Sequence, residues 1–183
     1  LHPRQGMKLA SWNVNGIRAV QRKGELEAFL RDHDPDVLFL QEVKAHPDKL
    51  DEQLTAHSEY FQFYNPAQKA GYAGTGVWVK RSFAKAPEMS RSMDGFEDDE
   101  GRIVRADINE WTLIGVYFPN GGKSEEAWHG KLAFYEQFLT HIDALRRQGR
   151  RVVWCGDVNC AHEEIDIARP KENKDSIGFL PEE

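Results

Sequence analysis

A helical repeat of apolar residues that leads directly into a short apolar run constrains the fold of this chain most strongly. The spacing i, i+3, i+4, i+7, i+10 predicts an amphipathic helix that ends by Gly149. Val152–Cys155 then predicts a buried strand. A sheet that contains buried strands must pack against another layer, such as this helix. The repeat therefore favours an α/β architecture. Its apolar positions are Tyr135, Phe138, Leu139, Ile142 and Leu145.

Further strands are predicted where short apolar runs meet turn-forming residues. These runs are Lys8–Trp12, Val37–Leu40, Val77–Lys80, and the pair Arg102–Ile108 and Trp111–Phe118. The pair is joined at Asn109 and Glu110, which predicts a tight turn between them. Strands of this length, separated by helical patterns, indicate sheets covered by helices.

The remaining segments predict helices and connections. Helical spacing around Leu26–Leu30 stops at His33–Pro35, and Asp48–His57 predicts another short helix. The glycines of Gly71–Gly76 predict a flexible loop, and the acidic segment Asp94–Glu100 predicts a solvated connection. The sequence contains no internal repeat or interdomain linker, so we expect one mixed α/β domain.

Length and composition limit the classes of protein that this chain can belong to. Its 183 residues, 40% of them hydrophobic, suffice for the core of a single domain. No stretch approaches the roughly 20 apolar residues that span a bilayer, and the start lacks a secretory signal. We therefore expect a monomer that contacts no membrane and works in the cytoplasm, with the nucleoid in a bacterium or in the nucleus of a eukaryote. Residues 1–6 precede Met7 and resemble an expression remnant, so we assign the domain to residues 7–183.

Charge and cysteine content exclude little, but they narrow the chemistry. The formal net charge of −6 argues against a uniformly basic surface, although lysines and arginines can still gather on one face. Two cysteines, Cys155 and Cys160, argue against a disulfide framework and fit a reducing compartment. Cys160 and His162 resemble half of a zinc site, but no second pair of soft ligands is spaced to complete it.

Polar residues follow four of the predicted strand ends. Singly, each has a structural explanation: Asp157 could cap a turn, Glu42 could be a solvated strand end, and Tyr117 could be a core residue. Together they favour metal-assisted phosphoryl chemistry, because amide and carboxylate oxygens suit Mg²⁺ and an aspartate beside an asparagine can hold and activate water. The set is Asn13 and Asn15, Glu42, Tyr117 with Asn120, and Asp157 with Asn159.

Blocks of sequence surround these strand ends. The four main blocks are Trp12–Arg18 (WNVNGIR), Leu40–Lys44 (LQEVK), Tyr117–Gly122 (YFPNGG) and Gly156–Asn159 (GDVN). Three more are Asp99–Arg102 (DEGR), Ala161–Asp166 (AHEEID) and Arg169–Asn173 (RPKEN). In this order, and over nearly the whole chain, they resemble the exonuclease III family of apurinic/apyrimidinic endonucleases. The glutamate and the GDVN block are shared with the wider superfamily, whereas the other blocks favour a DNA nuclease over inositol phosphatases or sphingomyelinases.

The resemblance implies a four-layer α/β sandwich, in which helices flank two packed mixed sheets and the active site lies at one end. It also implies that Glu42, assisted by Asn15, holds Mg²⁺, which Mn²⁺ could replace, against a phosphate oxygen. Asp157 would orient or deprotonate the attacking water. Asn159 would hold the phosphate or that aspartate.

The same resemblance implies roles for the remaining polar residues. Tyr117 would stabilise the transition state or the departing 3′ oxygen, and Asn13 and Asn120 would complete the polar wall against the DNA. The expected reaction is incision 5′ to an abasic site in base excision repair, leaving a 3′ hydroxyl and a 5′ deoxyribose phosphate. We also expect 3′–5′ exonuclease and 3′-phosphodiesterase activity on double-stranded DNA with 3′-blocked ends.

Five more residues match the family pattern for DNA binding. A glycine-rich loop lets backbone amides approach phosphates, and cationic side chains add salt-dependent affinity. Solvation at the surface is the alternative explanation for each of them. The residues are Arg18, Lys44, Tyr72, Lys123 and Asn173.

The sequence departs from the family pattern in two respects. Ala73 and Ser176 stand where related enzymes often have serine and asparagine, which affects individual DNA contacts. The family also continues beyond the position of Glu183 with further strands, a late aspartate that helps to bind metal, and a final Asp-His pair. None of the seven histidines here matches that pair, and His162 belongs to another block. We therefore expect this chain to lack part of its second sheet and part of its active site.

Two other functions remain open from the sequence. One is a phosphoesterase of the same superfamily that acts on an inositol phosphate or a lipid, against which Tyr117–Gly122 and Arg169–Asn173 argue. The other is a noncatalytic fragment that binds DNA or a partner protein, which the missing final motif would favour. A comparison of abasic DNA with inositol phosphates as substrates would distinguish the first alternative from a DNA nuclease. A cleavage assay of this chain beside an extended one would distinguish the second.

Overall fold

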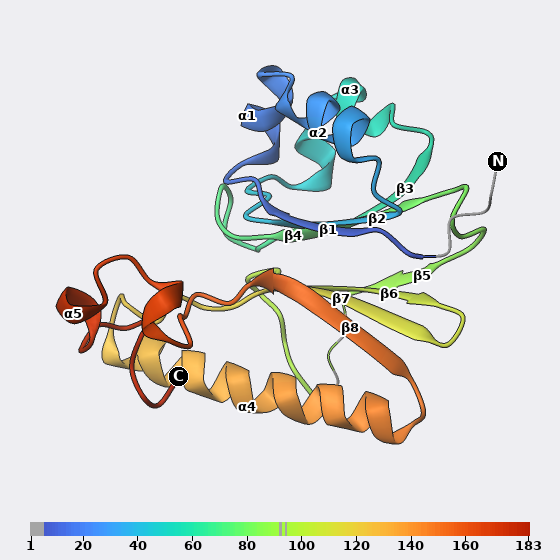
Figure 1. Cartoon of the computed structure of the whole chain (residues 1–183). Helices are drawn as coiled ribbons and strands as arrows, with labels where there is room; N and C mark the ends of the chain where they lie inside the picture. The colour runs from blue at the N-terminus through green and yellow to red at the C-terminus, as the bar shows by residue number, and fades with distance from the viewer. Residues whose placement is uncertain (1–5, 92, 94) are drawn as a thin grey trace.

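The structure, a computed structural model, describes residues 6–91, 93 and 95–183. Two four-stranded mixed sheets pack face to face, and helices cover both outer faces (Figure 1). This arrangement confirms the predicted four-layer sandwich. Residues 1–5 of the expected remnant and Asp94 of the acidic segment lie outside the described residues.

Each sheet is built from one continuous part of the chain. The first has the order β1-β2-β4-β3, and the second the order β5-β6-β7-β8. The strands are β1 Leu9–Asn13, β2 Val37–Gln41, β3 Tyr60–Asn65, β4 Thr75–Lys80, β5 Glu88–Ser90, β6 Ile103–Ile108, β7 Trp111–Tyr117 and β8 Arg151–Asp157. The helices are α1 Ile17–Arg22, α2 Glu25–His33, α3 Glu52–Thr55, α4 Glu125–Arg147 and α5 Pro170–Asn173, with 3₁₀ turns η1 Pro47–Lys49 and η2 Glu164–Asp166.

Strand β2 is buried on both faces because it lies between two apolar layers. Leu38 and Leu40 pack in the layer beneath α1 and α2, whereas Val37 and Phe39 face the second sheet. Gly115 of β7 makes room for Phe39, since a Cβ atom at this glycine would lie 2.4 Å from Phe39 Cδ1. The Phe39 ring therefore packs directly against the backbone of β7 at Gly115.

Helix α4 forms the outer layer on the second sheet. Its N-cap, Ser124, accepts a hydrogen bond from Ala127 N (3.1 Å), and Phe134 and Phe138 pack on the sheet. The prediction that Leu139 belongs to the buried face is wrong, because this side chain is 59% exposed. Leu139 lies beside Trp154 at the outer side of β8, where no further strand of the described residues covers it.

Three other local predictions need correction. Asp48–His57 is not one helix, because η1 ends at Lys49 and α3 begins at Glu52. Asp51, with an extended backbone, is the N-cap of α3, and its carboxylate accepts a hydrogen bond from Leu54 N (3.1 Å). Val152–Cys155 lies in a half-exposed edge strand rather than a buried one. Asp98, in the acidic segment, is half-buried and accepts hydrogen bonds from Arg102 N and Ile103 N.

The parallel pairs in the two sheets bring four strand ends to one end of the sandwich. Asn13 of β1 is in register with Gln41 of β2, and Tyr117 of β7 is in register with Asp157 of β8. Strands β1 and β8 also point to the same side of the molecule (Figure 1). Among the described residues, no helix is long and apolar enough to cross a bilayer.

Candidate active site

One amide group joins the two sheets at this end of the sandwich. Asn13 Nδ2, at the end of β1, donates to Glu42 Oε1 (2.8 Å) and to Asp157 Oδ2 (3.0 Å). Its Oδ1 accepts a hydrogen bond from Asn15 N (3.0 Å). The structure thereby brings together two carboxylates that lie on different sheets, as the sequence predicted for the strand ends.

The second carboxylate oxygen of Glu42 faces a cation. Lys44 Nζ lies 2.7 Å from Glu42 Oε2 and 2.5 Å from Asn15 Oδ1. Burial raises the pKa of Glu42, but hydrogen bonds from Asn13 and Lys44 and the charge of Lys44 outweigh burial, so the pKa lies below its ordinary value. Glu42 is therefore a carboxylate at neutral pH.

The contacts of the Lys44 ammonium indicate whether Glu42 and Asn15 could hold a divalent ion. They show that a carboxylate oxygen and an amide oxygen converge on one positively charged atom, the donor set that Mg²⁺ prefers. Within the described residues, no group of three or more histidine, cysteine, aspartate or glutamate side chains could hold an ion. The pair Glu42 and Asn15 thus fits an ion bound by one carboxylate and completed by water or substrate oxygens.

Several candidate residues adopt left-handed backbone conformations. The φ angles are 45° at Asn15, 51° at both Glu42 and Lys44, and 50° at Asn159. Such angles are uncommon outside glycine and persist only where the surroundings enforce them. Backbone hydrogen bonds between the loops do so here, including Gly16 N to Glu42 O (2.7 Å) and Lys44 N to Ala73 O (2.9 Å).

The Tyr117 hydroxyl donates a hydrogen bond to Glu42, and the charge of Asp157 also acts on it. Burial and then the charge of Glu42 raise the pKa of Tyr117 to about 12, so the phenol remains a proton donor at neutral pH. The Arg102 guanidinium lies 5.0 Å from the centre of the Tyr117 ring and donates to Tyr117 O (3.0 Å). Arg102 belongs to a sequence block noted above but was not predicted as a site residue.

Asp157 and Asn159 are held by a local turn. Asn159 N donates to Asp157 Oδ1 (3.0 Å), and Asn159 Nδ2 donates to Phe118 O (2.7 Å). Each oxygen of Asp157 thus accepts one hydrogen bond, from Asn159 and from Asn13. A carboxylate oxygen has a second lone pair, so both remain able to accept a proton or a water hydrogen bond.

Basic side chains surround Tyr72 next to this site. Lys123 Nζ lies 4.6 Å from the centre of the Tyr72 ring and Lys69 Nζ lies 5.5 Å from it. Lys123 and Arg102 both donate to the Tyr72 hydroxyl at 3.4 Å. Arg18 and Lys44 line a neighbouring cavity of about 310 Å³ together with Tyr72. Four of the five further DNA-binding candidates are therefore adjacent.

Two candidates make only local hydrogen bonds in this structure. Asn120 is exposed, and its Oδ1 accepts from Gly122 N (3.1 Å). Asn173 Nδ2 donates to Ala168 O (2.9 Å) and Arg169 O (3.2 Å) within its own turn. Their predicted roles toward DNA stay predictions.

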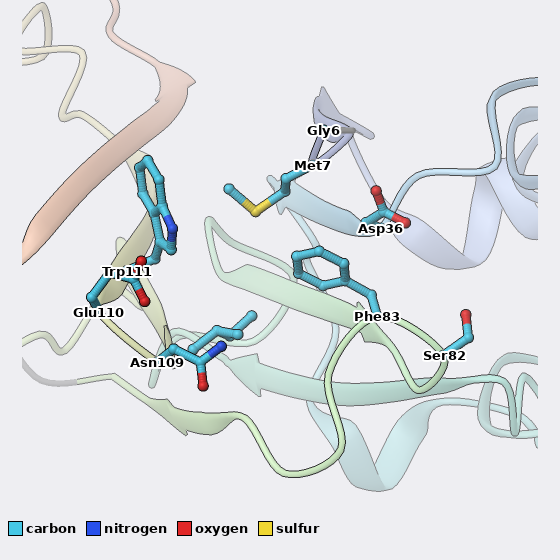
Figure 2. Close-up of a pocket in the computed structure, with 9 residues that line it drawn as sticks. Gly6, Met7, Asp36, Ser82, Phe83, Asn109, Glu110 and Trp111 are labelled. Atoms are coloured by element: carbon cyan, nitrogen blue, oxygen red, sulfur yellow. The ribbon is translucent and has the colours of Figure 1, made fainter. Parts of the chain in front are cut away.

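Another cavity lies at the opposite end of the sandwich. It measures about 560 Å³ and lies where β1, β2 and β7 begin, with Met7, Phe83 and Trp111 around it (Figure 2). Asp36 also lines it, and this carboxylate accepts a hydrogen bond from Lys8 N (2.8 Å). None of the candidate site residues contributes to this cavity, so its size does not mark the reaction centre.

The sequence profile of the endonuclease/exonuclease/phosphatase family matches residues 10–181. The chain belongs to the endonuclease/exonuclease/phosphatase family. This membership, with exodeoxyribonucleases and apurinic endonucleases among the relatives, confirms the resemblance inferred from the sequence blocks.

Individual members of the endonuclease/exonuclease/phosphatase family match nearly the whole chain. An exodeoxyribonuclease of Bacillus subtilis is 37% identical over 179 residues, which are 97% of this chain and 68% of the relative. DNA repair nuclease APEX1 of Danio rerio is 33% identical, covering 97% of this chain and 56% of the relative. The structure of an AP endonuclease from Archaeoglobus fulgidus superposes with a TM-score of 0.82 at 29% identity, covering 97% of this chain and 66% of that one. The chain thus spans 56% to 68% of the length of these proteins.

Proposed function

We propose that this protein is a DNA-repair nuclease that hydrolyses the phosphodiester 5′ to an abasic site. The observation that carries the proposal is the Asn13 amide, which holds the cation-binding carboxylate of Glu42 beside the carboxylate of Asp157. Relatives named exodeoxyribonuclease, DNA repair nuclease and AP endonuclease support the same activity. We extend the proposal to 3′–5′ exonuclease and 3′-phosphodiesterase activity on double-stranded DNA.

Glu42 and Asn15 would hold the divalent ion, since their oxygens already converge on the ammonium of Lys44. Nucleases of this family generally use divalent metal ions, and we propose Mg²⁺, with Mn²⁺ as a substitute. When bound, the ion would neutralise charge on a phosphate oxygen. Lys44 would leave its place between the two oxygens and become free to pair with a DNA phosphate.

Asp157 would orient the attacking water and accept its proton. Its two oxygens are fixed by Asn13 and by the backbone N–H of Asn159, so the remaining lone pairs have defined directions. Tyr117, protonated at neutral pH, would donate to the departing 3′ oxygen or to the transition state. The Asn159 side chain holds the loop to Phe118, and Asn120 would complete the wall once DNA is bound.

DNA would lie across the basic side chains beside the carboxylates. Arg18, Lys44 and Lys123 would contact phosphates, and Tyr72 would place its hydroxyl and backbone against the same strand. Asn173 would contact the DNA after giving up its local hydrogen bonds. Double-stranded DNA with abasic or 3′-blocked sites is the proposed substrate, and a monomer is the proposed binding unit.

We also propose that residues 7–183 form the N-terminal and central part of one domain. The relatives are longer than this chain, and β8 lies at an open sheet edge with Trp154 40% exposed. Further residues of the kind found in those relatives would cover this edge and supply a partner for Asp157. The 183-residue chain alone should then cleave slowly.

A comparison of four proteins tests this function. The 183-residue chain and a form extended to the length of the Bacillus subtilis relative are each prepared with and without Asp157→Asn. Single-turnover cleavage of an abasic duplex should collapse in the extended mutant and change little in the short one, because residues that act as a unit lose activity nonadditively. Affinity for the duplex should largely survive.

One result would count against each part of the proposal: the mechanism, the need for further residues, and the substrate. Full cleavage by the extended mutant would remove Asp157 from the mechanism. Strong Asp157-dependent cleavage by the short chain would show that further residues are not needed. Faster hydrolysis of inositol phosphates than of abasic DNA would assign the protein to another branch of the family.

A further inference from the structure

Helix α4 sends two side chains, one turn apart, to the loop that carries Asp157. Lys131 Nζ donates to Asn159 O (2.8 Å), and the Tyr135 hydroxyl donates to Val158 O (3.2 Å). These are consecutive carbonyl groups immediately after Asp157. Residues four positions apart on a helix lie on the same face, which explains how one helix can hold both carbonyls.

Lys131 is an unusual residue to find in this place. Its side chain is completely buried, and it forms an ion pair with the Glu183 carboxylate, which is 1% exposed. Glu183 also accepts hydrogen bonds from Gly178 N (2.6 Å) and Leu180 N (3.0 Å). A buried lysine has a large desolvation cost, so a hydrophobic residue would be the simpler way to fill this space.

The stem of Lys131 contacts a second loop of the site. A Cβ atom at Gly121 would lie 2.9 Å from Lys131 Cδ, and the φ angle of Gly121 is 79°. Gly121 follows Asn120 in the block that begins with Tyr117. The same lysine thus packs beneath the loop after β7 and bonds the loop after β8.

The Asp157 loop needs such support because its geometry is strained. Asn159 has a left-handed backbone (φ 50°), and its N–H donates to Asp157 Oδ1 (3.0 Å). We propose that Lys131 and Tyr135 are positioning residues that hold Val158 and Asn159 so that Asp157 keeps its orientation. The inference rests on the proposed nuclease function, because it concerns the carboxylate that would activate water.

The central test removes the charge pair without leaving an unpaired buried charge. In the double variant Lys131→Met/Glu183→Gln, methionine keeps most of the stem against Gly121, and glutamine still accepts from Gly178 N and Leu180 N. The matched control is Lys23→Met/Glu25→Gln, which removes an exposed ion pair of 3.8 Å between α1 and α2. The conservative variant Lys131→Arg keeps a donor at this position and should retain most of the activity that the double variant loses.

Cleavage is measured on the extended form and compared with affinity for the same abasic duplex. The double variant should lose roughly 100-fold in single-turnover rate, because misplacement of a reacting group by about 1 Å has effects of this size. Its Kd should stay within about threefold of the parent, and the exposed-pair control should leave both unchanged. A rate within twofold of the parent would overturn the proposal, as would equal losses in rate and affinity.

Amide hydrogen exchange on the 183-residue chain separates this inference from the proposed function. Exchange at Asn159 should accelerate about tenfold in the double variant, while amides in β2 keep their protection. If the extended parent does not cleave abasic DNA, the nuclease proposal fails, and this exchange result alone decides the positioning role of Lys131 and Tyr135. Unchanged exchange at Asn159 would refute it.

Tyr135→Phe covers the case in which the double variant does not fold. It removes only the hydroxyl that donates to Val158 O and keeps the ring in its apolar layer. The cleavage rate should fall several-fold with unchanged DNA affinity, and exchange at Asn159 should accelerate. Parent-like rate and exchange in this variant would overturn the proposal.

Discussion

Glu42 and Lys44 share a conformation that neither residue type favours. Both have φ near 51°, and they flank Val43, which is buried beneath the first sheet. The alternation directs both charged side chains to the same side of the chain, where they meet Asn15. A left-handed non-glycine residue costs roughly 1–2 kcal/mol, so folding elsewhere in the protein must offset this local strain.

At this scale, Glu42→Gln tests the proposed metal ligand. The change preserves the shape and the hydrogen bond from Asn13 but removes the negative charge that would bind the ion. Metal-dependent cleavage by the extended form should fall by roughly two to four orders of magnitude, while DNA affinity changes little. Rates are measured across a Mg²⁺ titration. Unchanged cleavage at saturating Mg²⁺ would show that Glu42 is not the ligand.

The thiol of Cys155 offers a prediction about pH. Burial raises its pKa from 9.0 to about 11, against a smaller opposing hydrogen bond from Ser11. Because the pKa is raised on folding, the stability that this group contributes is complete below pH 9.0 and is lost as pH rises toward 11. In a Cys160→Ser background, alkylation of Cys155 by iodoacetamide should be slow at pH 8.5 and accelerate steeply toward pH 11. Equal rates in native and urea-unfolded protein at pH 8.5 would contradict the burial argument.

Among the structural elements, β2 and β7 meet where Phe39 of one sheet packs against Gly115 of the other. Gly115→Ala would place a methyl group 2.4 Å from Phe39 Cδ1, so the sheets would have to separate or Phe39 would have to move. We expect a loss of about 1–3 kcal/mol in the free energy of unfolding, measured by urea denaturation. Gly130→Ala on α4 is the matched control, since no atom lies within 4 Å of the position that the added methyl group would take. This variant should gain about 0.5–1 kcal/mol.

The elements that the sequence predicted are those with simple periodicity. The buried runs of β2 and β7 and the apolar face of α4 follow directly from residue spacing. Strand β3 was not predicted because YFQFYN mixes apolar and amide side chains in a half-buried strand. Helix α1 was not predicted because its six residues are too few to show a repeat.

For the molecule as a whole, the net charge of −6 hides a local excess of positive charge. Lys69 and Lys123 surround Tyr72, and Arg18 and Lys44 line the adjacent cavity. If all four cations contact phosphates, the slope of log affinity against log salt should be about −3 to −4. Lys123→Met should reduce the slope by about 1, whereas Lys85→Met, an exposed lysine beyond the end of β4, should leave it unchanged. Fluorescence anisotropy with an abasic duplex measures both, and equal slopes for the two variants would argue against this surface.

The sequence singled out candidate site residues, but it could not show how they are connected. The resemblance singled out Glu42 and Asp157, and the structure shows that Asn13 joins them through one amide. Lys131 had no visible signal, because a lysine near the start of an amphipathic helix resembles a solvated residue. Its burial depends on Glu183, which is 52 positions away, and sequence spacing carries no information about such a pairing.

The two bonds of the Asn13 amide also have a kinetic meaning. Each sheet forms from one continuous part of the chain, but the bond from Asn13 to Asp157 spans 144 positions and closes only when the sheets dock. Contacts between distant segments form late because a long loop must first be closed. During refolding, the far-ultraviolet circular dichroism signal should therefore recover before Asp157-dependent cleavage activity. A chain in which both sheets have formed but have not docked would be inactive.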